Sequence, residues 1–222
     1  MPAKSDPFHA IDISNLAFKL ADEGRSVIHM EFGQPAAGAP RQALDAARSA
    51  LDAGVPGYWE SYPLKRRLAE RYKTLYGAQV EPKQILLTCG ASPALVLALS
   101  TAFSPGDRVA VGRPGYVAYR NTLRGLHMDA VEIACGAETR FQLTAAHLEA
   151  LDPAPAGVII SSPANPTGSI IPPDELARIA DVCAARGIRI VSDEIYHGLV
   201  YDGTAQSMLA YTPDALIVNS FS

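Results

Sequence analysis

The sequence predicts an α/β fold with a mostly parallel central sheet and helices on both faces. Short apolar segments alternate with amphipathic ones along most of the chain, which is the pattern of α/β proteins. Apolar runs such as 157–160 and 188–191 are typical of parallel strands that are covered on both sides. Of the 222 residues, 48% are hydrophobic and 19% are charged, so the chain can bury a large core.

The part of the chain before residue 78 is predicted to be helical. Apolar residues recur there at helical spacing, and a glycine follows each run as a stop signal. A loop is expected at 33–40, which is rich in Gly and Pro. We predict helices over 11–23, 41–53 and 63–76, followed by Gly24, Gly54 and Gly77.

From residue 84 onward, strands and helices are predicted to take turns. The expected strands are 85–88, 108–111, 130–133, 158–161, 188–191 and 215–219. The expected helices are 92–103, 116–126, 144–151 and 173–186. Open α/β sheets bind ligands at the carboxyl ends of their strands, so functional residues are expected in the loops that follow them.

The loop after the first of these strands has the character of an anion site. Gly90, Ala91 and Ser92 lead into a helix, whose free N–H groups and dipole can face a negative charge. We expect Ser92 to cap this helix and Pro93 to take its first position. An ordinary capped helix with nothing bound is the alternative. The loop matches no nucleotide-binding glycine motif.

Three later loops carry further candidates. Tyr116 follows a strand and can either stack on a flat ligand or pack in the core. Asn165 lies between two prolines, which make its loop rigid. Asp193 ends a buried strand, where an acid needs a cation or several hydrogen-bond donors, and Tyr196 can face the same cavity. The alternative for Asp193 is a helix cap.

Composition argues against several other classes of function. Lys and Arg total 19 and Asp and Glu total 23, a net charge of −4 without charged blocks, so neither nucleic acid nor a membrane is the expected partner. The 3 cysteines and 5 histidines show no metal-ligand spacing, and no metal is expected. The chain start shows no secretion signal and the cysteines are unpaired in number, so we expect a cytoplasmic protein.

From residue 31 to 222, the loops in their order resemble the cofactor site of the fold-type-I pyridoxal-phosphate (PLP) enzymes, specifically the class I/II aminotransferases. The strings that carry this resemblance are Gly33-Gln34-Pro35, Gly57-Tyr58, Gly90-Ala91-Ser92, Pro105-Gly106-Asp107, Pro114-Gly115-Tyr116, Asn165-Pro166-Thr167-Gly168, Asp193-Glu194-Ile195-Tyr196 and Ser220-Phe221-Ser222. The resemblance implies that residues 1–40 belong to a small domain. It also implies that residues 41–222 form the PLP-binding large domain, incomplete at its C-terminal end.

The resemblance also implies a role for each site residue. Asp193 would pair with the ring nitrogen of PLP, Asn165 and Tyr196 would hydrogen-bond its phenolic oxygen, and Tyr116 would stack on the ring. The phosphate would lie over the start of a helix and receive a hydroxyl from a later loop, at Gly90, Ala91, Ser92 and Ser220. In a homodimer, Tyr58 would reach the phosphate of the other subunit. Gly33 would approach the substrate carboxylate. We also expect a cis peptide at Asn165–Pro166.

In the family, the Ser-x-Ser string is followed by the lysine that forms a Schiff base with PLP, whereas this sequence stops at Ser222. We expect a longer parent protein interrupted at a modified lysine; a chain truncated at this point is the alternative.

The implied activity is transfer of an amino group between an amino acid and a 2-oxo acid. The alternatives are other PLP chemistry on the same fold, namely a C–S β-lyase, a decarboxylase or an acyl-transferring synthase, and a truncated chain without catalytic activity.

Overall fold

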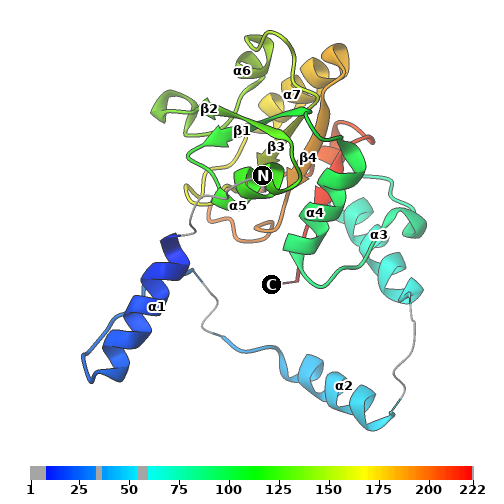
Figure 1. Ribbon diagram of the computed structural model, residues 1–222. Helices are drawn as coiled ribbons and strands as arrows, with labels where there is room; N and C mark the ends of the chain where they lie inside the picture. Colours follow the sequence, from blue (N-terminus) through cyan, green and yellow to red (C-terminus); the bar gives the residue numbers. More distant parts are fainter. Residues whose placement is uncertain (1–8, 34–36, 55–59, 222) are drawn as a thin grey trace. The chain divides into compact units, whose positions relative to one another are not determined.

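A computed structural model describes residues 9–33, 37–54 and 60–221 of the chain (Figure 1). These residues fall into two compact units, one within 6–60 and one within 61–222. The assignment of 1–40 to a small domain and 41–222 to a large domain stays a prediction. The smaller unit contains α1 (His9–Asp22) and α2 (Arg41–Asp52), close to the expected helices.

The larger unit is built on a five-stranded sheet in the order β2-β1-β3-β4-β5, and each pair of neighbours is parallel. This arrangement confirms the predicted fold class. The strands agree with the predicted ones to within two residues at each end. They are β1 (Arg108–Arg113), β2 (Asp129–Ala134), β3 (Gly157–Ser161), β4 (Arg189–Asp193) and β5 (Leu216–Val218).

The prediction of a strand at 85–88 is wrong. A short 3₁₀ helix, η1 (Pro82–Gln84), precedes this segment, and Ile85 has an extended backbone with φ −98° and ψ 124°. The segment pairs with none of the five strands, and Leu86 is 65% exposed. A strand needs a neighbour for its backbone hydrogen bonds, and the described residues provide none at this position.

Five α-helices and two further 3₁₀ turns complete the larger unit. Their bounds follow the sequence prediction closely, and α7 matches it at both ends. The α-helices are α3 (Tyr62–Tyr76), α4 (Ala91–Ala102), α5 (Val117–Gly125), α6 (Ala145–Glu149) and α7 (Pro173–Arg186). The 3₁₀ turns, which the sequence did not predict, are η2 (Ala137–Thr139) and η3 (Met208–Ala210).

The start of α4 differs from the prediction. Gly90 is the N-cap, so Ser92 and Pro93 occupy the second and third helical positions, and no side chain caps the helix. Gly90 has φ +102°, a region that glycine enters without steric cost. This conformation turns the chain into the helix earlier than a capping serine at position 92 would.

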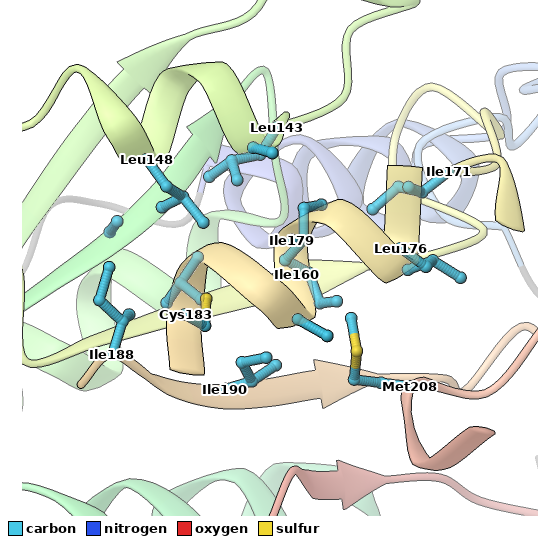
Figure 2. Close-up of a cluster of buried hydrophobic side chains, with 14 of the residues drawn as sticks. Leu143, Leu148, Ile160, Ile171, Leu176, Ile179, Cys183, Ile188, Ile190 and Met208 are labelled. Atoms are coloured by element: carbon cyan, nitrogen blue, oxygen red, sulfur yellow. The ribbon is translucent and has the colours of Figure 1, made fainter. Parts of the chain in front are cut away.

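Helices cover both faces of the sheet. Successive strand residues point to opposite sides, so each strand contributes side chains to both of these interfaces. On one face, Ile160 of β3 and Ile190 of β4 pack with α6 and α7. Figure 2 shows this core, in which Leu176, Ile179 and Cys183 line one side of α7. On the other face, β-strand residues such as Val109 and Val191 pack with α4 and α5.

The close contact of β3 with Phe103 can be tested through Gly157, which starts that strand. A methyl group at Gly157 would overlap the buried ring of Phe103. We expect Gly157→Ala to lower the free energy of unfolding by about 1–3 kcal/mol, measured by urea denaturation. The double variant with Phe103→Leu should recover part of the loss.

Gly125→Ala serves as the control, because a methyl group there meets no atom within 4 Å. It lies at the end of α5 and should be neutral or stabilising by up to about 1 kcal/mol. Equal effects of the two alanine substitutions would contradict the close packing of Phe103 on the start of β3.

Candidate functional site

Asp193 is the last residue of β4 and is only 8% exposed. Its Oδ2 accepts a hydrogen bond of 2.5 Å from the Tyr119 hydroxyl, and its Oδ1 accepts one of 3.1 Å from the Ile195 amide. Burial raises the pKa of the Asp193 carboxyl, and these two hydrogen bonds oppose the rise. A carboxylate has about four acceptor positions, so a further donor can still bind.

Three aromatic or polar side chains gather around this carboxylate. Asn165 Nδ2 donates a hydrogen bond of 3.3 Å to the Tyr196 hydroxyl. The pKa of Tyr116 is raised, first by burial and then by the nearby groups Tyr196 and Asp193. The structure therefore brings Tyr116, Asn165, Asp193 and Tyr196 together, while their roles toward a ligand stay predictions. The peptide bond before Pro166 is cis, as expected.

The start of α4 lies on the same face of the sheet as Asp193. Leu95 and Leu99 of α4 pack against Val191, which points to the same side of β4 as Asp193. The amides of Ala91 and Ser92 belong to the first turn of α4, so the helix itself contains no carbonyl four residues earlier to accept their hydrogen bonds. These amides and the helix dipole favour an anion at this end of α4.

The remaining predicted residues lie in three different places. Ser220 follows β5, and its amide donates a hydrogen bond of 2.8 Å to Asn219 Oδ1. Because β3, β4 and β5 are parallel, their carboxyl ends lie at the same end of the sheet, where Asp193 ends β4 and Asn165 and Ser220 come after β3 and β5. Gly33 lies in the smaller unit, and Tyr58 lies outside the described residues, so their roles stay predictions.

Tyr119 is a site residue that the sequence analysis missed. Its ring meets that of Tyr116 edge-on, with centroids 5.4 Å apart, and its hydroxyl donates to Asp193. Tyr119 comes three residues after Tyr116, so both lie on one side of the first turn of α5. That spacing was the available signal, but the distance to Asp193 depends on how α5 packs on the sheet.

Glu194 is a second buried acid, and it points to the opposite face from Asp193. It is 1% exposed, and its Oε1 accepts hydrogen bonds from the Ser192 and Ser207 hydroxyls and from the Met208 amide. Its Oε2 lies 3.7 Å from His197 Nδ1. Burial raises the pKa of Glu194 to about 7 despite these donors.

His197 completes this second buried cluster. Its Nδ1 lies 2.8 Å from the Tyr76 hydroxyl of α3, and burial lowers its pKa to about 4. On the α3 side, the Tyr72 hydroxyl accepts a hydrogen bond of 3.0 Å from Asn219 Nδ2. The cluster therefore joins α3 to the segments that follow β4 and β5, and no sequence pattern predicted it.

The chemistry of the first cluster fits a flat cationic ring with an anionic tail. The pKa of Asp193 is set by burial and by its two hydrogen bonds, and no cation of the described residues contributes to it. A buried carboxylate without a cationic partner can stabilise a protonated ring nitrogen. The aromatic face of Tyr116 and the free amides at the start of α4 suit the ring and the anion.

Within residues 9–33, 37–54 and 60–221, no three His, Cys, Asp or Glu side chains gather as metal ligands would. Among the helices of the same residues, none has the length and apolar character needed to cross a membrane.

Comparison with known proteins places these features in a family. The profile of the family described as "Aminotransferase class I and II" matches residues 26–222. The valine–pyruvate aminotransferase of Mycobacterium tuberculosis is 43% identical over 97% of this chain and 57% of its own length. The aspartate aminotransferase of Geobacillus stearothermophilus is 32% identical over 94% of this chain and 54% of its own length. The chain thus spans somewhat more than half the length of these relatives.

Solved structures show the same fold. An aminotransferase from Mycobacterium tuberculosis superposes with a TM-score of 0.95 at 42% identity, covering 100% of this chain and 59% of that one. The aspartate aminotransferase from Thermus thermophilus with maleate gives a TM-score of 0.92 at 28% identity, covering 98% of this chain and 58% of that one.

The buried residues Glu194 and His197 should affect the pH dependence of the free energy of unfolding in opposite directions. The pKa of Glu194 is raised from 4.5 to about 7, so its ionisation lowers the free energy of unfolding as pH rises through that range. The pKa of His197 is lowered from 6.5 to about 4, so protonation of the unfolded chain lowers stability as pH falls through that range. In the wild type the two slopes oppose each other.

Without Glu194, only the contribution of His197 remains. We therefore expect the free energy of unfolding of Glu194→Gln to rise between pH 4 and 6.5, by on the order of 3 kcal/mol. In His197→Gln only the contribution of Glu194 remains, so its free energy of unfolding should fall between pH 4.5 and 7. Urea denaturation at a series of pH values measures both profiles. Profiles parallel to the wild type in both variants would contradict the raised pKa of Glu194 and the lowered pKa of His197.

Proposed function

The chain belongs to the class I and II aminotransferase family, and from this premise we propose that the complete protein is a PLP-dependent aminotransferase. It would exchange an amino group between an amino acid and a 2-oxo acid. The observation that carries the proposal is the Asp193 carboxylate, buried at a strand end without a cationic partner among the described residues. The aminotransferase names of the relatives favour this activity over lyase, decarboxylase or acyl-transfer chemistry.

Asp193 would keep the ring nitrogen of PLP protonated. When bound, PLP supplies an electron sink for the amino acid, and this sink is effective when the ring carries a positive charge. An ionised Asp193 beside that charge stabilises it in a region of low dielectric constant. Tyr119 supports the ionised form, because its hydroxyl donates to Oδ2 over 2.5 Å.

The other residues would hold the ring and its phosphate. Asn165 and Tyr196 would donate hydrogen bonds to the phenolic oxygen of the ring, and Asn165 Nδ2 lies 3.3 Å from the Tyr196 hydroxyl. Tyr116 would cover one face of the ring. The phosphate would bind at Gly90, Ala91 and Ser92, with a further hydroxyl from Ser220.

We propose pyruvate and 2-oxoglutarate as the first amino acceptors to test, and an aliphatic amino acid as the first donor. The valine–pyruvate aminotransferase that is 43% identical to this chain supports that order.

A cytoplasmic homodimer is also part of the proposal. On α4, Val96 and Leu97 are each 42% exposed, which suits a surface that a second subunit covers. In such a dimer Tyr58 would contribute to the phosphate site of the partner, and Gly33 would approach the substrate carboxylate. Cys89, Cys135 and Cys183 are free, as is usual in a reducing compartment.

The role of Asp193 can be tested by Asp193→Asn, which keeps its size and removes its charge. We expect the rate of the amino acid half-reaction in the complete protein to fall at least about a hundredfold. Cofactor absorbance in stopped flow measures this rate. Glu194→Gln is the matched control, because Glu194 is the neighbouring buried acid on the opposite face and should cause a much smaller loss. Near wild-type activity in Asp193→Asn would contradict the proposal.

The phosphate site can be tested by comparing PLP with pyridoxal, which lacks the phosphate. Ser92→Ala should raise the Kd for PLP about tenfold and leave the Kd for pyridoxal unchanged, because only PLP carries the anion. Ser100→Ala on the same helix is the control, since the Ser100 hydroxyl donates to the Leu97 carbonyl instead. Equal effects on both ligands would exclude Ser92 from the phosphate site.

A further inference from the structure

Gln142 is a buried side chain that bridges the two ends of the loop carrying Asn165. It is 6% exposed and lies between η2 and α6. Its Nε2 donates hydrogen bonds of 3.2 Å to the Ser161 carbonyl and 2.7 Å to the Ser169 carbonyl. Ser161 ends β3 and pairs with Asp193, so one amide group contacts both the strand end and the far side of the loop.

The loop also has hydrogen bonds of its own. The Ala164 amide donates to the Ser169 carbonyl over 2.9 Å, and the Gly168 amide donates to the Ala164 carbonyl over 2.7 Å. The Ile171 amide donates to the Ser162 hydroxyl over 3.0 Å. The Ser169 carbonyl thus accepts from both Ala164 and Gln142, which uses both of its lone pairs.

The segment before Gln142 adopts an unfavourable backbone that directs it to this loop. Arg140 and Phe141 have φ of +53° and +58°, a region that costs free energy for residues other than glycine. Arg140 Nη2 donates a hydrogen bond of 3.0 Å to the Ile170 carbonyl, next to the one that Gln142 contacts. Two consecutive residues with positive φ persist only when contacts such as these hold them.

We propose that Gln142 is a positioning residue, which holds the 161–171 loop so that Asn165 stays within reach of Tyr196 and of the bound ring. This inference rests on the proposed function for its link to PLP. Its structural half concerns only the loop and can be tested without the cofactor.

The test uses two substitutions of similar size. Gln142→Met removes both hydrogen bonds. Gln142→Glu replaces the amide donor with a carboxyl group, which donates one hydrogen bond when protonated and repels both carbonyl oxygens when ionised. Its effect should therefore increase as pH rises. Circular dichroism checks that each variant folds, and Gln142→Glu replaces Gln142→Met in both measurements below if Gln142→Met does not fold.

The first measurement is hydrogen exchange of the complete protein without PLP. In Gln142→Met, the amides of Ala164, Gly168 and Ile171 should exchange about tenfold faster or more than in the wild type. Amides of β4 should keep their rates.

The control is Arg186→Met, which removes another side chain that donates to backbone carbonyls. Arg186 donates to the carbonyls of Leu148, Glu149 and Leu151, at the end of α6. This variant should lower stability without changing exchange in the loop.

The second measurement is the pH titration of the visible absorbance of bound PLP. Loss of the Asn165 hydrogen bond should shift this titration, and Gln142→Met should shift it in the same direction as Asn165→Ala. A purely structural role would change stability but leave the titration in place.

The outcomes separate the two proposals. Unchanged loop exchange in Gln142→Met overturns the inference, whatever the activity. Faster exchange with an unchanged titration, when Asn165→Ala does shift it, also overturns the inference and leaves the proposed function intact. Failure of the wild type to bind PLP overturns the proposed function and, with it, the positioning role.

Discussion

The structure of the site depends on a carboxylate buried at the end of a parallel strand. Removing Asp193 from water costs free energy, and the hydrogen bonds from Tyr119 and Ile195 only partly offset that cost, because the pKa of Asp193 remains raised. A cationic ring beside it would complete the compensation. This is why a site that is costly for the folded chain alone suits a cofactor that carries a positive charge.

Strand geometry gives the two adjacent acids at the end of β4 different environments. Asp193 points toward α5 and the candidate cofactor site, whereas Glu194 points to the other face. There Glu194 accepts hydrogen bonds that hold the start of η3, including one of 2.9 Å from the Met208 amide. One residue therefore contributes to the candidate chemistry, and its neighbour contributes to the fold.

The loops that follow the carboxyl ends of β3 and β5 are held by side chains from elsewhere in the fold. Gln142 holds the loop that carries Asn165, and Tyr72 of α3 holds Asn219 beside Ser220. Such support restricts the movement of groups that must meet a ligand at fixed distances. The rigid sheet positions the strand ends, and these distant side chains position the loops between them.

The sequence by itself determined the parallel α/β fold, all five strands of the sheet, the α-helices and the loops in which the candidate site residues lie, because periodicity and the Gly and Pro signals are local properties. It also determined the family resemblance, through short strings that follow the strand ends. The prediction of a strand at 85–88 was wrong, because an apolar sequence pattern does not indicate whether a partner strand lies beside the segment.

Only the tertiary structure decided the contacts of Tyr119, Gln142, Glu194 and His197. Tyr119 and Asp193 are separated by 74 residues, and Gln142 and Ser169 by 27. These contacts depend on how helices and loops pack on the sheet, and no local pattern in a single sequence records that packing.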